Sequence, residues 1–246
     1  MNYLEIGLLF FIVSLLASFT GRGGGLIYLS ILIYFNGVST ESKILSFLLI
    51  IATSLPHLKK ALKEIDKAIV YKLLLPSLSS YFLIGIICQS PNGILFLIII
   101  LFIGLSSLLV LWFPIKTSRE NFNLPRGKTE FYTLFASGIS AYVGLSPSLL
   151  LIPFLTNQLK MDMRKAIPYL HFQNLIVVSA GLVSVVLSSN LVHYPNFEQV
   201  GIQIGMVLCG SYLGKMLLVK SNLFWTKFIF TILSVFSLLL TILSVL

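Results

Sequence analysis

Apolar stretches long enough to cross a lipid bilayer recur along the whole chain. A transmembrane helix needs about 20 apolar residues to cross ~30 Å of hydrocarbon, and ranges such as 67–88 and 223–245 meet this requirement. Only 10% of the residues carry a formal charge, against roughly 25% in an ordinary soluble domain. Together these features exclude a water-soluble fold and predict an all-α integral membrane protein with several crossings, whose surroundings are the lipid bilayer.

The breaks between the apolar runs divide the chain into two similar halves. Charged residues, Pro and Gly separate about five helical segments in each half. We predict a first membrane repeat over 1–113, a cytoplasmic linker over 114–128 and a second membrane repeat over 129–246. The expected segments are 3–20, 25–36, 41–57, 67–88 and 92–113, followed by 129–144, 148–159, 167–189, 197–219 and 223–245.

The positions of Lys and Arg predict the orientation. Of the 17 such residues, all except Arg22, Lys43 and Lys215 fall on one side of the alternating segments, and cytoplasmic loops retain positive charge. Lys43 is expected in an outer loop, and Lys215 is expected to extend its amine to the cytoplasmic surface. Both termini are therefore predicted outside. The same distribution accounts for the net charge of +9 with no nucleic-acid partner.

An odd number of crossings in each half predicts inverted repeats. The second half then enters the membrane from the side opposite to the first. The repeats are inverted if each half crosses five times, and also if it crosses three times because the first two segments form a re-entrant hairpin. Inverted repeats are a common plan of secondary transporters.

The segments 25–36 and 148–159 are too short to cross the bilayer alone. About 12 residues rise only about 18 Å. Each segment follows a stretch that breaks helices, Gly21-Arg22-Gly23-Gly24-Gly25 in the first half and Gly144-Leu145-Ser146-Pro147-Ser148 in the second. We expect these breaks to re-enter the membrane at equivalent places, and paired broken helices indicate a transport site.

The residue types at these breaks suit an anion. A helix N-terminus exposes unpaired N–H groups and a partial positive charge, and glycine lets a ligand approach the backbone. Ser146 and Ser148 offer hydroxyl donors, and Arg22 offers a charged planar donor. Two structural alternatives stay open: the glycines serve close helix packing, or Arg22 extends to a lipid headgroup.

A polar cluster follows Pro168, which is expected to start the eighth segment. His171 and Asn174 share one helical face, and Tyr169 and Gln173 share another. Polar residues in a membrane helix face the protein interior, so these donors are expected to complete the anion site. The alternative is a hydrogen-bond network between helices that contacts no ligand.

Small residues in the ninth segment predict close helix packing. Gly201 and Gly205, and then Gly210 and Gly214, repeat at the small-xxx-small spacing. The two cysteines, Cys88 and Cys209, are expected as small core residues, since they lie in separate apolar runs.

The predicted site contains substrate-binding residues only. The sequence contains no H-E-x-x-H, G-x-S-x-G or phosphate-loop motif, so we expect no catalytic residue, metal ligand or cofactor. The predicted substrate-binding residues are Gly21, Arg22, Gly23, Gly24, Gly25, Gly144, Ser146, Ser148, His171, Gln173 and Asn174.

The chain resembles the sulfite exporter TauE/SafE family, also called the toluene sulfonate uptake permease family. Gly21-Arg22-Gly23-Gly24-Gly25 looks like the family's glycine signature, and Glu64-Ile65-Asp66 looks like the end of its polar connector. In the second half the resemblance is carried by Gly144, Pro153, Ala166 and Ser179-Ala180-Gly181. The chain departs from the family pattern where Ser146-Pro147-Ser148 replaces glycines and where Ser30 replaces a proline.

The resemblance implies a bacterial inner-membrane transporter of sulfite or organic sulfonates with two homologous halves. A small anionic solute moved by alternating access around a midplane site is our leading expectation. Transport of a cation or neutral solute remains an alternative, as does a membrane enzyme or assembly protein without transport. Substrate identity, direction, coupling ion and oligomeric state, a homo-oligomer included, stay open.

Overall fold

A computed structural model gives the architecture of the chain. It describes residues 3–20, 24–64, 67–87, 93–112, 126–155, 163–188, 197–220 and 223–244, and these ranges contain helices and no strand. The helices are α1 (Tyr3–Thr20), α2 (Gly25–Asn36), α3 (Thr40–Ser54), the 3₁₀ turn η1 (Leu55–His57), α4 (Leu58–Glu64), α5 (Lys67–Ile87), α6 (Gly93–Trp112), α7 (Arg126–Val143), α8 (Ser148–Pro153), α9 (Met163–Ser188), α10 (Phe197–Lys220) and α11 (Leu223–Leu243). The all-helical fold class is thus confirmed.

Each predicted segment corresponds to a helix, and three of the boundary differences affect the predicted site and linker. The α-helical part of α8 ends at Pro153, and the helical backbone continues as a wider turn to Leu155, the last described residue before 163. The helix α9 begins at Met163, so Pro168 lies inside it and does not start it. The helix α7 begins at Arg126, inside the predicted linker. Most of that linker, 113–125, lies outside the described residues.

Several helices have the length and composition to cross a membrane. Four apolar stretches of 18 residues or more meet this criterion in the described ranges: Thr40–Lys63, Val70–Ile87, Ala166–Ser188 and Phe197–Leu217. Shorter apolar helices cover Leu4–Ser18, Gly25–Asn36, Gly93–Leu109 and Thr231–Leu243. The chain is therefore a multi-pass membrane protein.

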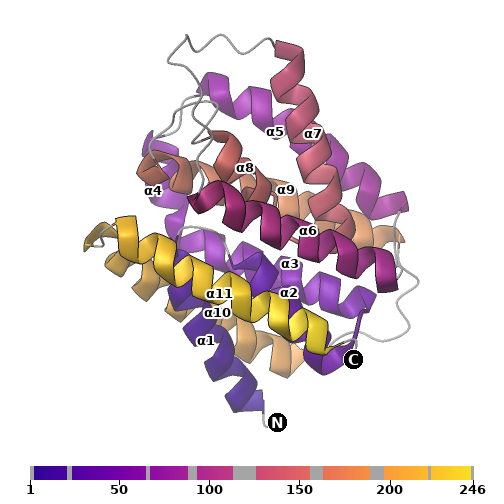
Figure 1. Ribbon diagram of the computed structural model, residues 1–246, viewed down its shortest axis with the longest axis vertical. Coiled ribbons are helices and arrows are strands. Elements are labelled where there is room, and N and C mark those ends of the chain that lie inside the picture. The colour runs from indigo at the N-terminus through magenta and orange to yellow at the C-terminus, as the bar shows by residue number, and fades with distance from the viewer. Residues whose placement is uncertain are drawn as a thin grey trace.

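The helices α3 and α9 contact each other and lie between two flanking groups (Figure 1). On one side α10 packs on α3, and on the other α5 packs on α9. The first helix of each half contacts the opposite half, since α1 packs on α10 and α7 packs on α5. The short helices also contact the opposite half: α2 packs on α11, and α8 packs on α6. Every contact named for one half thus has a counterpart in the other.

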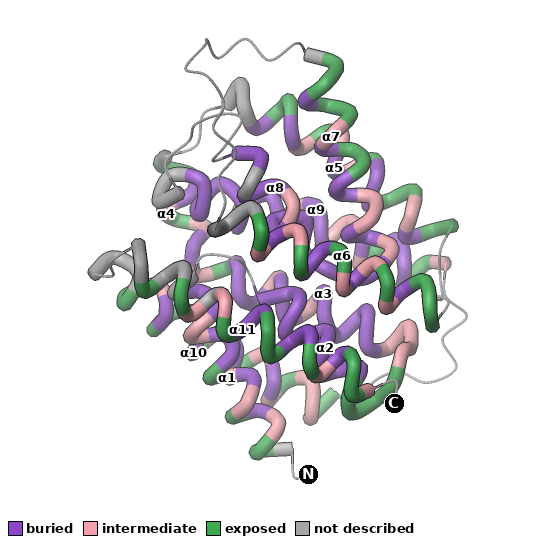
Figure 2. The backbone as a smooth tube through the Cα atoms, in the orientation of Figure 1, coloured by how far each residue is buried: buried purple, intermediate pink, exposed green. Residues whose placement is uncertain are grey.

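Burial is concentrated in the central helices (Figure 2). The helix α2 is buried from Gly25 to Ile33, whereas α6 and α11 carry many exposed apolar side chains. Large exposed apolar side chains on outer helices are the surface that lipid covers. Cys209 is exposed on α10, which corrects the prediction of a core position. Cys88 lies outside the described residues.

Glycines on α10 decide how closely this helix approaches α1. A Cβ on Gly210 would lie 2.3 Å from the Phe11 carbonyl oxygen, and one on Gly214 would lie 2.2 Å from that of Leu15. A Cβ on Gly201 or Gly205 would meet no other atom within 4 Å. The predicted close packing therefore holds for the second pair of glycines and is wrong for the first, because that end of α10 does not bring its glycines against another helix.

We predict that Gly210→Ala and Gly214→Ala each lower the free energy of unfolding by about 1–3 kcal/mol, since the new methyl group forces the helices apart. The matched control Gly205→Ala adds a methyl group in open space and is expected to change stability by less than ~1 kcal/mol. Thermal unfolding of the detergent-solubilised variants measures both effects. Equal unfolding temperatures for all three variants would contradict this account of the α1–α10 contact.

Candidate functional site

The two helix-breaking stretches meet in the protein interior. A Cβ on Gly25, the first residue of α2, would lie 3.0 Å from the backbone nitrogen of Ser146. Gly24 and Gly144 both adopt left-handed conformations, with φ of 66° and 89°. All four residues are buried. The start of α2 is therefore in direct contact with the break that precedes α8.

Glycine is required at both turns. A Cβ on Gly24 would lie 2.8 Å from the ring of Tyr28, and one on Gly144 would lie 2.8 Å from Cγ of Lys43. In the left-handed region any side chain adds strain to this crowding. Gly144 also ends α7, because its N–H and that of Leu145 both donate to the Ser140 carbonyl at 2.9 Å.

Side chains from neighbouring helices satisfy the carbonyls of the second break. The Ser46 hydroxyl of α3 donates to the Gly144 carbonyl at 2.9 Å. The Tyr81 hydroxyl of α5 donates to the Leu145 carbonyl. Non-helical backbone inside a membrane protein requires such partners, so α3 and α5 hold this break in place.

Ser146 connects the break to α9. Its hydroxyl donates to Oδ1 of Asn174 at 2.8 Å and accepts from the Ser148 N–H at 3.2 Å. Because the Ser146 proton is used in this way, the Ser148 hydroxyl donates in the bond between the two serines. Pro147 is the residue before α8, which begins at Ser148 as predicted. The structure thus brings Ser146, Ser148 and Asn174 together.

The amide nitrogen of Asn174 is buried and has no hydrogen-bond partner. The residue is 1% exposed, and its oxygen already accepts from Ser146. An unpaired buried amide costs about 1–3 kcal/mol. It offers two N–H donors to an acceptor beside the start of α8.

His171 contacts a second histidine that the sequence analysis did not select. The rings of His57 and His171 are stacked at 3.9 Å with an interplanar angle of 7°. Each ring carries a buried Nε2 without a partner. His57 follows Pro56 near the end of the predicted third segment, and hydropathy patterns carry no signal for its contact with α9.

Gln173 lies on a different face of α9. Its Nε2 donates to the Ser77 hydroxyl at 2.7 Å, which also accepts from Ser137 at 2.8 Å. Ser77 is on α5 and Ser137 is on α7. The structure therefore places Gln173 in a network between helices, away from the contact of Ser146 with Asn174.

Lys43 is buried, contrary to its predicted place in an outer loop. It lies in the first turn of α3, which Ser39 caps by accepting from the Ser42 N–H, and it is 1% exposed. Its Cγ lies against Gly144. A capping Ser before Thr-Glu-Ser-Lys is the sequence signal that would have started this helix earlier than 41. The lysine brings a positive group into the interior near the second break.

Three of the predicted site residues, Gly21, Arg22 and Gly23, lie outside the described residues. Their roles remain predictions. Within the described residues no group of three or more His, Cys, Asp or Glu could hold a metal ion.

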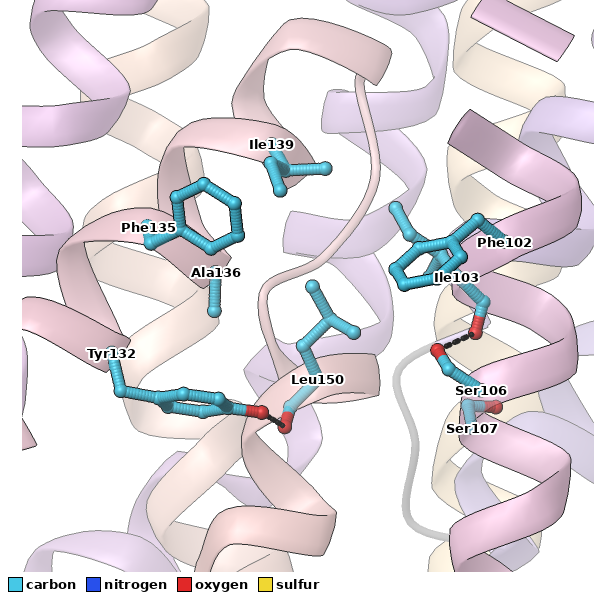
Figure 3. A pocket seen from close by; sticks show the side chains of 9 residues that line it. All are labelled: Phe102, Ile103, Ser106, Ser107, Tyr132, Phe135, Ala136, Ile139 and Leu150. Carbon is cyan, nitrogen blue, oxygen red and sulfur yellow. Dashed lines mark hydrogen bonds between the residues drawn. The ribbon is translucent and has the colours of Figure 1, made fainter. Parts of the chain in front are cut away.

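A cavity of about 280 Å³ lies between α6, α7 and α8, apart from these polar groups (Figure 3). Its walls are mainly apolar, and the Tyr132 hydroxyl at its edge donates to the Leu150 carbonyl at 3.0 Å. Phe102 and Phe135 line it and are 65% and 58% exposed. Such a lining offers an anion few donors, so we do not place the anion there.

Comparison with known proteins assigns the chain to a family. The family model described as "Sulfite exporter TauE/SafE" matches residues 6–241. The comparisons with curated proteins and with solved structures gave no match. Because the matched range covers nearly the whole sequence, the chain belongs to the TauE/SafE family of sulfite exporters.

Proposed function

We propose that the protein is a secondary transporter of a small oxyanion, sulfite or an organic sulfonate, which it binds where α2 begins beside the Ser146–Ser148 break. The observation that carries the proposal is the buried, unpartnered amide of Asn174, whose oxygen bonds to Ser146 at this break. An oxyanion is an acceptor with several oxygens, and it would satisfy this donor.

Other groups at the same place favour a negative charge. The helix α2 has 12 residues, and its buried N-terminus carries a partial positive charge. The helix α8 has only six residues and adds no dipole, and the Ser146 and Ser148 hydroxyl protons are already used, so these serines position the Asn174 amide. The buried side chain of Lys43 lies against Gly144 at the same break. These groups together attract an anion.

The acidic residues support an anion over a cation. Among the described side chains, no Asp or Glu is buried, and Glu5, Glu130 and Glu198 are exposed. Cation carriers need interior carboxylates or carbonyl oxygens as ligands. An anion that leaves a negative cytoplasm alone gains about 2.3 kcal/mol per charge for each 100 mV, and each proton that moves with it cancels the gain of one charge.

The helix contacts support alternating access between two inverted repeats. The pairs α1–α10 and α7–α5 correspond, as do α11–α2 and α6–α8. The polar contacts repeat as well: Ser18 of α1 donates to Ser211 of α10 at 2.7 Å, and Ser137 of α7 donates to Ser77 of α5 at 2.8 Å. Since equivalent helices carry equivalent contacts, two related units can exchange conformations around the central α3 and α9.

We predict that Asn174→Asp lowers sulfite flux in proteoliposomes by about 100-fold or more. The change keeps the acceptor for Ser146 and replaces the amide donor with a negative charge that repels the anion. Ser179→Ala, which removes a hydroxyl that donates to the Leu175 carbonyl of its own helix, is the matched control and is expected to stay within about twofold of wild type. Equal flux in the wild type and the Asn174 variant would refute this binding site.

A second prediction concerns Arg22. We expect Arg22→Ala to raise the half-saturating sulfite concentration about 10- to 100-fold, because a hydrogen bond to a charged group contributes about 1.5–3 kcal/mol. Arg22→Lys keeps the charge without the planar donors and is expected to fall between wild type and Arg22→Ala. Unchanged saturation curves for Arg22→Ala would show that this residue does not bind the anion.

The proposed orientation can be tested with reporters. A reporter fused after Leu246 is expected outside, and one inserted in the linker at Asn121 is expected in the cytoplasm, because Lys and Arg gather on the linker's side. Activity of periplasmic and cytoplasmic reporter enzymes at both positions measures this. A cytoplasmic signal from the carboxy-terminal fusion would reverse the orientation or change the number of crossings.

A further inference from the structure

The stacked histidines form a second polar centre in the interior. His57 is 1% exposed and so is His171, and their ring centroids lie 3.9 Å apart. One ring comes from the turn η1 after α3 and the other from α9, the two central helices. Buried imidazoles with an unpartnered Nε2 on each ring are costly unless a ligand bonds to them.

The hydrogen bonds around His171 determine its tautomer. Its Nδ1 lies 3.3 Å from the Ser54 hydroxyl oxygen. Ser54 uses its own proton to donate to the Ile50 carbonyl at 2.9 Å, so Nδ1 of His171 carries a hydrogen and donates to Ser54. In the neutral ring, Nε2 is then a bare acceptor. It is the atom of this pair that is ready to take a proton.

Positive charges surround the pair. Lys60 of α4 and Lys215 of α10 act electrostatically on His57, and the Lys215 amine donates to the Pro56 carbonyl at 2.6 Å. This contact places the Lys215 amine at the turn η1, and its extension to the membrane surface stays a prediction. A proton on the histidine pair adds a further positive charge here, and a nearby anion offsets the repulsion.

The other titratable groups on the adjoining helices lie elsewhere. In α3, Glu41 and Lys43 are near the opposite end of the helix from Ser54, and in α5 Tyr71 and Lys72 are exposed. Tyr81 of α5 donates to the Leu145 carbonyl. On α9 itself Tyr169 is buried with an unpartnered hydroxyl, and on α4 Lys59 and Lys63 are exposed. The helix α8 has no titratable residue. None of the described groups supplies a negative charge to the pair.

The histidine pair adjoins the proposed anion site. Asn174 and His171 are three residues apart on α9, so they share a face and are separated by about 4.5 Å along the helix axis. The polar side chains of Ser146, Asn174, His171 and His57 therefore follow one another from the second break to the stacked histidines. An anion that accepts from Asn174 lies within about one helical turn of the proton-accepting Nε2.

We propose that His171 is a proton-binding site that is filled together with the transported anion, so that the protein moves an oxyanion and a proton as a pair. This inference rests on the proposed function. The proton comes from water on the side where the anion enters, forms an N–H bond at Nε2 of His171, and leaves that atom to water on the side of release. His57 is a positioning residue, because its stacked ring holds the His171 ring. Each binding event stabilises the other, as linkage requires.

The test uses the purified full chain in proteoliposomes, with labelled methanesulfonate as the probe because this strong acid stays ionised across the pH range. With the membrane potential clamped at zero, a gradient of one pH unit is expected to drive accumulation up to about tenfold for one proton per anion. Labelled sulfite serves as the second probe. The accumulation ratio at equilibrium is an energetic quantity, so it separates coupling from transport rate.

Two histidine variants test the separate roles of His171 and His57. His171→Asn keeps an N–H donor for Ser54 but has no proton-accepting Nε2, and its accumulation ratio is expected to fall to about one while downhill flux remains measurable. His57→Phe keeps a flat ring in the stack and is expected to retain accumulation driven by the pH gradient, whatever its rate. Size-exclusion elution and thermal unfolding check that both variants fold, and Ser179→Ala is the matched control on α9.

The outcomes separate this inference from the proposed function. Downhill flux of methanesulfonate or sulfite in the wild type, with no response to the pH gradient, overturns proton coupling and leaves anion transport standing. A His171→Asn variant that still accumulates the anion overturns the assignment to His171. No flux of either anion in the wild type overturns the proposed function and this inference with it.

Discussion

The contact between two interrupted helices is the constraint on which the rest of the structure depends. A chain break inside a bilayer exposes N–H and C=O groups that lipid cannot satisfy, so protein groups must do it. Ser46 of α3 and Tyr81 of α5 bond to the carbonyls of Gly144 and Leu145. Gly25 allows the start of α2 to approach the Ser146 nitrogen. The central position of α3 and α9 follows from this need for partners around the break.

The short helices of the two halves, α2 and α8, differ in the residue at their sixth position. In the first half Ser30 of α2 contacts Ser237 at 2.6 Å and Thr241 at 2.8 Å, both on α11. Counting from the first residue of each short helix, Pro153 is the corresponding residue of α8, and this helix ends there. Ser30 thus joins α2 to α11 through its hydroxyl, a contact that a proline at this position could not make.

The sequence sufficed for those features that depend on local composition. Apolar run length located the helices, and the glycine at 144 located a turn, because left-handed backbone favours glycine. Features that depend on contacts between distant segments were missed. His57 is recognised as a site residue only through its contact with the His171 ring, and the burial of Lys43 becomes visible only from its contact with Gly144. Gly201 and Gly210 have equal local signals, and only the position of α1 distinguishes them.

Unpaired polar atoms on α9 that adjoin the second break identify the candidate binding residues. Each buried donor or acceptor without a partner costs about 1–3 kcal/mol, and both Asn174 and His171 carry such an atom on one face of the helix. On the other face Gln173 bonds to Ser77 through its nitrogen, although its oxygen and the Tyr169 hydroxyl are also buried without a partner. Asn174 and His171 share the face of α9 that adjoins Ser146 and Ser54. A fold that leaves a donor and a proton acceptor unpaired one turn apart is suited to a ligand that brings both an oxygen acceptor and a proton.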